Sequence, residues 1–143
     1  MGVKVRERKG MYRYLTFGLL TLLFSTSLVF PAFGGQFEDA TAAYERGDYA
    51  TAFRLMKPLA EKGNAGAQWF LGSMYAKGQG VPQDYVLAHK WFNLAASRHP
   101  ASKVESREGA VNNRDKVASK MTPEQIAEAQ RLAREWRPKK EGK

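Results

Sequence analysis

The 143-residue chain contains no cysteine, and this absence removes several kinds of chemistry at once. Without thiols there is no disulfide, no thiolate metal site, no cysteine nucleophile and no lipid-modified N-terminal cysteine. Histidine is nearly as scarce, since only His89 and His99 occur. No second histidine or acidic residue stands at metal-ligand spacing beside His89, and His99 lies next to a proline. We therefore expect no metal and no cofactor, with His89 on the surface or at an interface and His99 in solvent.

Patterns that mark catalytic centres are also missing. None of the serines has the surroundings of a nucleophile elbow. The Gly78-x-Gly80 pair follows no strand and has no phosphate-binding lysine at loop spacing, so it is interpreted as a helix turn. Acidic neighbours such as Glu105 and Glu108 are interpreted as solvated charges on a helix surface. The sequence thus predicts a protein that is not an enzyme.

The positive charge of the chain, +9 in total, is unevenly placed. Residues 1–34 hold five basic and one acidic residue, a net of +4. Residues 35–97 hold six of each sign, whereas residues 98–143 hold twelve basic and seven acidic residues, a net of +5. This distribution indicates a basic C-terminal end, with residues 138–143 as a charged, mobile tail, and it does not favour a nucleic-acid-binding face.

Basic residues gather ahead of an almost unbroken apolar run, Leu15 to Phe30. Small residues, Ala32 and Gly34, follow in the relation that export peptidases prefer. Residues 1–34 are therefore predicted to be a signal peptide cleaved near Gly34, which implies a periplasmic or secreted protein. The basic residues of this segment are Lys4, Arg6, Arg8, Lys9 and Arg13.

Two alternatives remain open for this segment. An uncleaved Leu15–Phe30 run would anchor the chain in the inner membrane, although its sixteen residues fall short of the roughly twenty that a spanning helix needs. Met11 could also be the true start, because the residues after it already form a charged end and an apolar run.

Two short helices joined by a glycine-rich turn are predicted for residues 65–100. Ala67, Leu71 and Tyr75 recur every four residues, so they share one helix face. Glycines mark the end of this helix, Pro82 suits the opening of the next, and Asp84 places negative charge near its N-terminus. Small residues on both helices, with large aromatic residues between them, predict a tightly packed antiparallel hairpin.

This pattern resembles the Sel1-like repeat, a relative of the tetratricopeptide repeat. The resemblance implies an all-α fold, a short α-solenoid of antiparallel helical hairpins, used for protein–protein assembly. The matching residues are Ala67, Leu71, Gly72, Tyr75, Gly78, Gly80, Val81, Asp84, Ala88, Trp91, Ala95 and Ala96.

The flanking segments are predicted to complete the stack. Residues 35–64 form a divergent first hairpin, with Asp48 as an N-cap and Pro58 bending or breaking its second helix. Residues 101–137 form a degenerate hairpin whose first helix has few apolar anchors, among them Val104. Its second helix opens with a capping box at Thr122 and closes the array, covering an apolar face.

A partner-binding face is predicted on the first helix of the central hairpin. Trp69, Ser73 and Lys77 follow one another at four-residue spacing, away from Leu71. In related solenoids the first helices line the concave surface. Trp69 is therefore the candidate recognition residue, and its burial against the first unit is the alternative.

The sequence thus favours an exported, non-catalytic scaffold or adaptor that binds a protein or peptide in the bacterial cell envelope. A cell-envelope hydrolase, or a regulator of one, is a second possibility. A third is binding to anionic surfaces through the basic residues near the C-terminus, namely Arg131, Arg134, Arg137, Lys139 and Lys140. Nucleic acid is not an expected partner, and contact with the membrane is expected only through an uncleaved signal segment.

Overall fold

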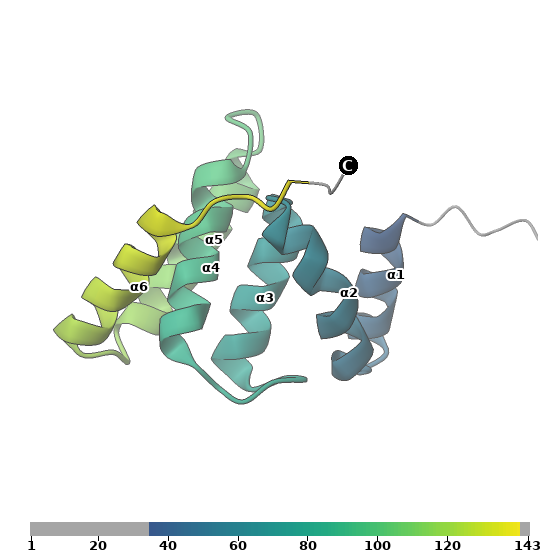
Figure 1. Cartoon of the computed structure of the whole chain (residues 1–143), viewed down its shortest axis with the longest axis horizontal. Coiled ribbons are helices and arrows are strands. Elements are labelled where there is room, and N and C mark those ends of the chain that lie inside the picture. The colour runs from purple at the N-terminus through teal and green to yellow at the C-terminus, as the bar shows by residue number, and fades with distance from the viewer. Residues whose placement is uncertain (1–34, 141–143) are drawn as a thin grey trace, which may run out of the picture. The chain divides into compact units, whose positions relative to one another are not determined.

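The computed structural model describes residues 35–140, and this part of the chain is built from six α-helices without any strand (Figure 1). The predicted all-α fold is confirmed. The predictions for the signal peptide, for the start at Met11 and for an anchor at Leu15–Phe30 concern residues outside the described part. Within residues 35–140, no helix is long and apolar enough to cross a membrane. The helices are α1 (Gln36–Glu45), α2 (Tyr49–Glu61), α3 (Ala65–Lys77), α4 (Tyr85–Arg98), α5 (Val104–Ala118) and α6 (Pro123–Glu135).

Side-chain caps start four of these helices at the residues where the chain offers a short polar side chain. Asp48 accepts a hydrogen bond from the Thr51 N–H at the start of α2, as predicted. Thr122 and Gln125 form the predicted reciprocal capping box at α6. Asn64 and Asp84 cap α3 and α4 in the same way. Each cap satisfies a backbone donor that the helix itself leaves unpaired.

The turn between α3 and α4 shows why glycine is needed there and corrects one expectation. Gly78 ends α3 in the left-handed region with φ +67°, and Gly80 has φ +72°. A Cβ on Gly80 would lie 2.5 Å from the Tyr49 carbonyl oxygen, so the turn touches the start of α2. Pro82 does not open α4, because the helix begins only after its N-cap, Asp84.

Small residues bring the helices together, and α4 is the central one. It packs against α3, α5 and α6, whereas α2 packs against α1 and α3. Gly72 of α3 lies so near α4 that a Cβ there would come within 2.7 Å of the Phe92 ring. Trp91, also on α4, is 6 % exposed. The alanines in this core are Ala40, Ala43, Ala52, Ala60, Ala67, Ala88, Ala95, Ala96, Ala110, Ala129 and Ala133.

Two details of the helices differ from expectation. The helix α2 continues without interruption through Pro58. Proline removes one hydrogen bond to the carbonyl four residues earlier, but the residue is exposed and water can replace that donor. Val104, expected as an anchor of α5, is 54 % exposed because it is the first residue of the helix, while Ala110 and Val117 are buried.

The residues after α6 form a strap that returns to the first hairpin, and we use this name for residues 136–140. In Figure 1 the strap runs in yellow from α6 past the end of α4 toward α2. The Trp136 ring meets the Trp91 ring edge-on and lies under the Arg98 guanidinium. Lys139 donates from its backbone N–H to the Glu61 carbonyl at 2.8 Å and from Nζ to the Glu61 carboxylate at 2.6 Å. The start of the predicted mobile tail is therefore docked.

Candidate partner-binding groove

The three predicted binding residues lie along one face of α3 and line a common hollow opposite α5. The helix spacing brings Trp69, Ser73 and Lys77 to this face, and α4 forms the floor between α3 and α5. The hollow has a volume of about 410 Å³. It is lined by Trp69, Ser73, Ala76, Lys77, Tyr85, Phe92, Asn113, Lys116, Val117 and Lys120.

A second hollow of about 330 Å³ continues along the same face, and Trp69 belongs to both. Together they form what we call the α3–α5 groove. Both volumes lie at the low end of the roughly 300–1,000 Å³ of small-molecule pockets, and both hollows are open. Each therefore suits a side chain of a partner rather than a fully enclosed substrate. The second hollow is lined by Gly66, Trp69, Phe70, His99, Glu105, Ser106 and Gly109.

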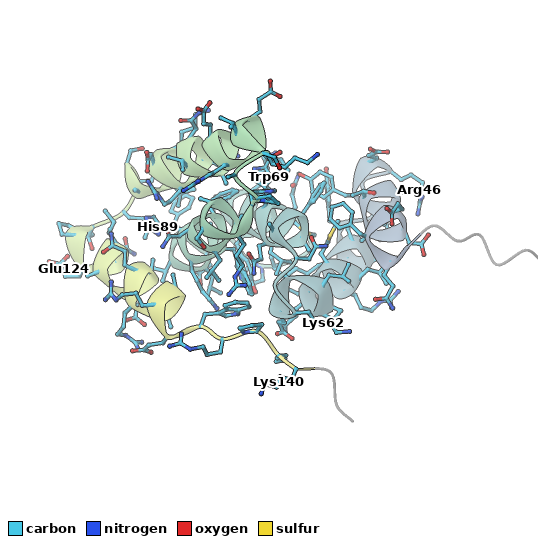
Figure 2. All side chains as sticks on the ribbon, turned by 90° about the horizontal axis from the view of Figure 1, so that it is seen from above. Arg46, Lys62, Trp69, His89, Glu124 and Lys140 are labelled. Atoms are coloured by element: carbon cyan, nitrogen blue, oxygen red, sulfur yellow. The ribbon has the colours of Figure 1, made fainter. Side chains whose placement is uncertain are left out.

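Trp69 is half-buried and lies between α3 and α5 (Figure 2). Its ring meets the Phe70 ring edge-on, with 5.2 Å between the centroids. It packs on buried residues of α4 and α5, among them Phe92 and Ala110. The burial of Trp69 is therefore directed toward α4 of its own hairpin and α5 of the next, and not toward the first hairpin as the alternative supposed. One part of the indole remains open to the groove.

The other two predicted residues differ from each other in exposure. Lys77 is exposed at the end of α3, where its ammonium can reach a ligand. Ser73 is only 5 % exposed, although the helical spacing placed it on the same face. The four-residue spacing placed Ser73 on the same face as Trp69 and Lys77, but it did not show that Ser73 is buried. Ser73 is buried because α4 and α5 cover the middle of α3.

Positive charge gathers at one end of the groove. Lys77, Lys116 and Lys120 all line the first hollow, which has no acidic residue in its wall. The Lys120 Nζ also lies 5.5 Å from the centroid of the Tyr85 ring, within cation–π range. The second hollow is different, because its charged residue is Glu105. Lys116, in α5, and Lys120, just after it, were not predicted to line the groove. Their position opposite Lys77 depends on how α5 packs, which the sequence pattern does not show.

His89 lies on the other side of α4, in contact with the space between α5 and α6 (Figure 2). It is 3 % exposed, so the expectation of a surface or interface histidine is wrong. Burial lowers the pKa of His89, and the nearby Arg114 cation lowers the pKa further, while Asp115 acts in the opposite direction. Its Nδ1 has no hydrogen-bond partner in the described structure. A neutral, packed imidazole of this kind has no oriented partner for acid–base catalysis.

The other residues weighed for chemistry in the sequence are the carboxylates of α5 and His99. Among residues 35–140, no three or more histidines and carboxylates come together as metal ligands. Glu105 and Glu108 are exposed on α5, as expected of solvated charges. His99 is partly buried and lines the second hollow of the groove, with its pKa lowered by burial and then by Lys103.

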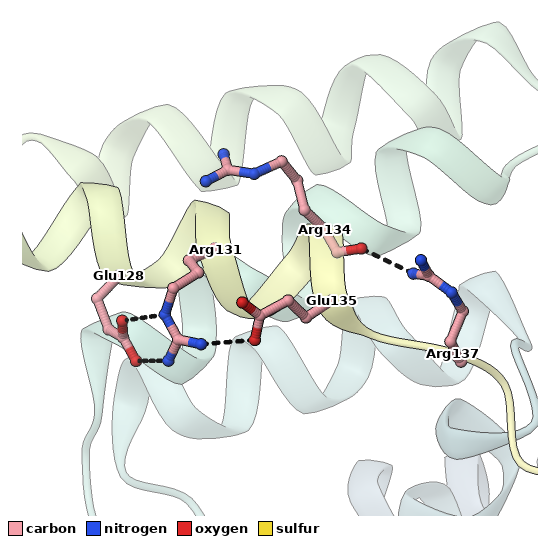
Figure 3. Close-up of polar contacts among 5 residues, drawn as sticks. All are labelled: Glu128, Arg131, Arg134, Glu135 and Arg137. Atoms are coloured by element: carbon pink, nitrogen blue, oxygen red, sulfur yellow. Dashed lines mark hydrogen bonds and ion pairs between the residues drawn. The ribbon is translucent and has the colours of Figure 1, made fainter.

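Several basic groups near the C-terminus are already engaged within the protein (Figure 3). Arg131 donates two hydrogen bonds to Glu128, at 2.8 and 2.7 Å, and a third to Glu135. These contacts lower the pKa of the Glu128 carboxyl. Arg137 donates to the Arg134 carbonyl at 2.7 Å. With Lys139 bound to Glu61, three of the five basic residues predicted to face anionic surfaces make internal contacts.

Comparison with known proteins agrees with this architecture. The family model described as "Sel1 repeat" matches residues 35–64 and 65–99, within one residue of the predicted boundaries. A segment of 56 residues is 39 % identical to an "Exopolysaccharide production negative regulator" of Rhizobium leguminosarum bv. viciae. That segment is 39 % of this chain, but it spans only 21 % of the relative. No solved structure matches the chain. Sel1 repeats generally mediate protein–protein interaction without catalysis, and residues 35–99 of this chain are two of them.

Proposed function

We propose that this protein is an exported, non-catalytic adaptor that holds a protein or peptide partner in the α3–α5 groove. The observation that carries the proposal is the position of Trp69 at the junction of two open hollows on α3 and α5. A half-exposed tryptophan in a well-packed groove is the kind of residue that dominates the binding energy of interfaces. The general role of Sel1 repeats in protein–protein interaction supports the same reading.

The physical basis of binding is burial of apolar surface next to polar contacts. A partner side chain placed on the open part of the Trp69 indole removes apolar surface from water on both sides, at about 25 cal/mol per Å². The floor beneath it, with Phe92 and Val117, is already rigid because both side chains are buried. A preformed floor lowers the entropic cost of association.

Location in the cell envelope is part of the proposal and is supported by the sequence of residues 1–34. A basic start, an apolar run and small residues before Gly35 are typical of a signal peptide. The relative that shares the 56-residue segment is described as a negative regulator of exopolysaccharide production, and this similarity supports a regulatory role for the proposed adaptor. Such a role would be exercised by holding another protein, with no need for an activated nucleophile or a metal.

The test places a photo-crosslinking amino acid in the groove of the full chain in intact cells. Positions Lys77 and Ser106 are suitable because both are exposed and line the two hollows. Arg54, exposed on α2 outside the groove, is the matched control. We expect the same crosslinked partner from both groove positions and none from Arg54.

A second variant connects the crosslink to the groove itself. Trp69→Ala should reduce the crosslink from Ser106 by about tenfold or more, the range for an interface hot spot. Circular dichroism of the purified variant should show unchanged helix content. Crosslinking that survives Trp69→Ala, or that occurs only from Arg54, would show that the partner is bound by another surface. Detection of the mature N-terminus by mass spectrometry tests export, and retention of Leu15–Phe30 would contradict cleavage.

A further inference from the structure

We propose that the partner segment is acidic, with its carboxylates at the lysine end of the α3–α5 groove and an apolar side chain on Trp69. This inference rests on the proposed function and names the chemistry of the partner. It would fix not only what binds but also the direction in which the segment lies along the groove.

The charge of the groove supports an acidic partner. Lys77, Lys116 and Lys120 are exposed, and within residues 35–140 no carboxylate forms an ion pair with any of them. The acidic residues next to the groove in sequence are occupied elsewhere. Asp84 accepts the Leu87 N–H at the start of α4, and Asp115 pairs with Arg114.

The helix ends do not cancel this charge. Lys77 and Lys116 lie in the last turns of α3 and α5, where the helix dipoles contribute negative charge. Each helix end is equivalent to about −0.5 of an elementary charge. Two such ends oppose three ammonium groups, so the lysine end keeps a net charge of about +2.

The floor of the groove indicates a peptide rather than a small free anion. Besides the lysines, the wall is mostly apolar or aromatic, with Ala76, Tyr85, Phe92 and Val117, and Ser73 and Asn113 are its uncharged polar residues. A hydrated inorganic anion gains nothing from such a wall, whereas a polypeptide can bury side chains on it. Asn113 in the same wall carries an amide that can both donate to and accept from a peptide backbone.

The polarity of the groove follows from its two hollows. The lysines occupy the first hollow, whereas the second contains Glu105 and the rings of Trp69 and Phe70. Carboxylates of a partner are attracted to the first hollow and repelled from the second. An aromatic or large aliphatic side chain of the partner fits the second hollow beside Trp69.

The experiment measures the anisotropy of three labelled ten-residue synthetic peptides added to the purified mature chain. The first peptide carries one phenylalanine followed by four glutamates, the second has lysines in place of the glutamates, and the third has alanine in place of the phenylalanine. We expect measurable binding only for the first peptide, with weaker binding at 300 mM than at 50 mM salt because screening shortens the range of the attraction.

Charge reversal locates the binding. The double variant Lys116→Glu and Lys120→Glu should weaken binding of the first peptide by about tenfold or more, since each lost pair is worth up to about fivefold and the new glutamates repel the carboxylates of the peptide. Lys57→Glu, at an exposed lysine on α2 outside the groove, is the control for charge reversal elsewhere on the surface and should leave binding unchanged within about twofold. Circular dichroism confirms that each variant is folded.

Several outcomes would overturn the inference. The inference is wrong if the acidic and basic peptides bind equally, or if Lys57→Glu weakens binding as much as the double variant does. It is also wrong if the acidic peptide does not bind at millimolar concentration, or if a single-stranded oligonucleotide displaces it at a concentration lower than that of the peptide. The proposed function fails separately. If the Trp69-dependent crosslink is present in cells but the acidic peptide does not bind, only the partner chemistry is wrong.

Discussion

Replacing Gly72 with alanine adds one methyl group to the contact between α3 and α4. The ideal Cβ position lies 2.7, 2.8 and 2.9 Å from the Cδ1, Cε1 and Cγ atoms of Phe92. Ordinary carbon contacts are about 3.5–4.0 Å, so the ring must move by most of an ångström. Because Cγ is the base of the ring, rotation of the ring about its own axis does not relieve the overlap.

The expected cost can be worked from two opposing effects. Overpacking of a filled core costs about 1–3 kcal/mol, and Phe92 is only 2 % exposed, which places this site in the upper half of that range. Alanine is favoured over glycine inside a helix by about 1 kcal/mol. The net loss in the free energy of unfolding should therefore be about 1–2 kcal/mol, or roughly 5–10 °C in Tm for a domain of this size.

The same substitution elsewhere in the chain is the control. A Cβ on Gly109, inside α5, would meet no atom within 4 Å. Only the helix preference remains, so Gly109→Ala should raise the stability by about 0.5–1 kcal/mol. Thermal and urea unfolding followed by circular dichroism measures both variants. A Gly72→Ala protein as stable as the original would refute the close approach of α3 and α4.

Three further predictions concern other parts of the fold. Thr122→Ala removes the cap of α6 and should lower the free energy of unfolding, measured in urea, by about 1 kcal/mol. Lys139→Ala removes an exposed ion pair and should lower it by less than that. Trp136→Ala should cost about 2–3 kcal/mol through lost packing on Trp91, and an unchanged Tm would contradict the docked strap. The pKa of His89 is lowered in the folded state, so at and below about pH 6.5 the unfolded chain binds more protons than the folded chain. The contribution of His89 to the free energy of unfolding is therefore complete above that pH and falls on acidification, at most by about 1.4 kcal/mol per pH unit. His89→Gln should flatten this slope between pH 7 and 5 in urea titrations, and an unchanged slope would refute the assignment.

The local parts of the fold could be predicted from the sequence because their causes lie within a few residues. Asp48 and Thr122 each precede a helix and cap it, and Gly78 ends one in the left-handed region. The four-residue spacing of Trp69, Ser73 and Lys77 also placed them correctly on a shared face. These signals depend on helix geometry, which is the same in every context.

Burial could not be predicted where a helix has neighbours on several sides. The helix α4 packs against α3, α5 and α6, and seven of its fourteen residues are buried. His89 lies among them for this reason, although a histidine is usually interpreted as a surface residue. Ser73 became buried in the same way, since the position of α5 is set by packing rather than by its weak apolar pattern.

The lysine end of the groove and the strap share a second limit. Lys116 and Lys120 meet Lys77 only after α5 has packed, and the Lys139–Glu61 contact joins residues 78 positions apart. No periodic pattern in the sequence indicates contacts between residues so far apart along the chain. Both features depend on the tertiary arrangement of the described helices.

The strap has a consequence for how this repeat protein unfolds. In an ordinary repeat array each unit touches only its neighbours, so the ends can unravel one unit at a time. Here Lys139 joins the segment after α6 to Glu61 at the end of the first hairpin, while Trp136 packs on Trp91 of the central repeat. The first and last units should therefore lose structure in one concerted step, and shortening the chain to residue 135 should convert that step into gradual fraying from both ends.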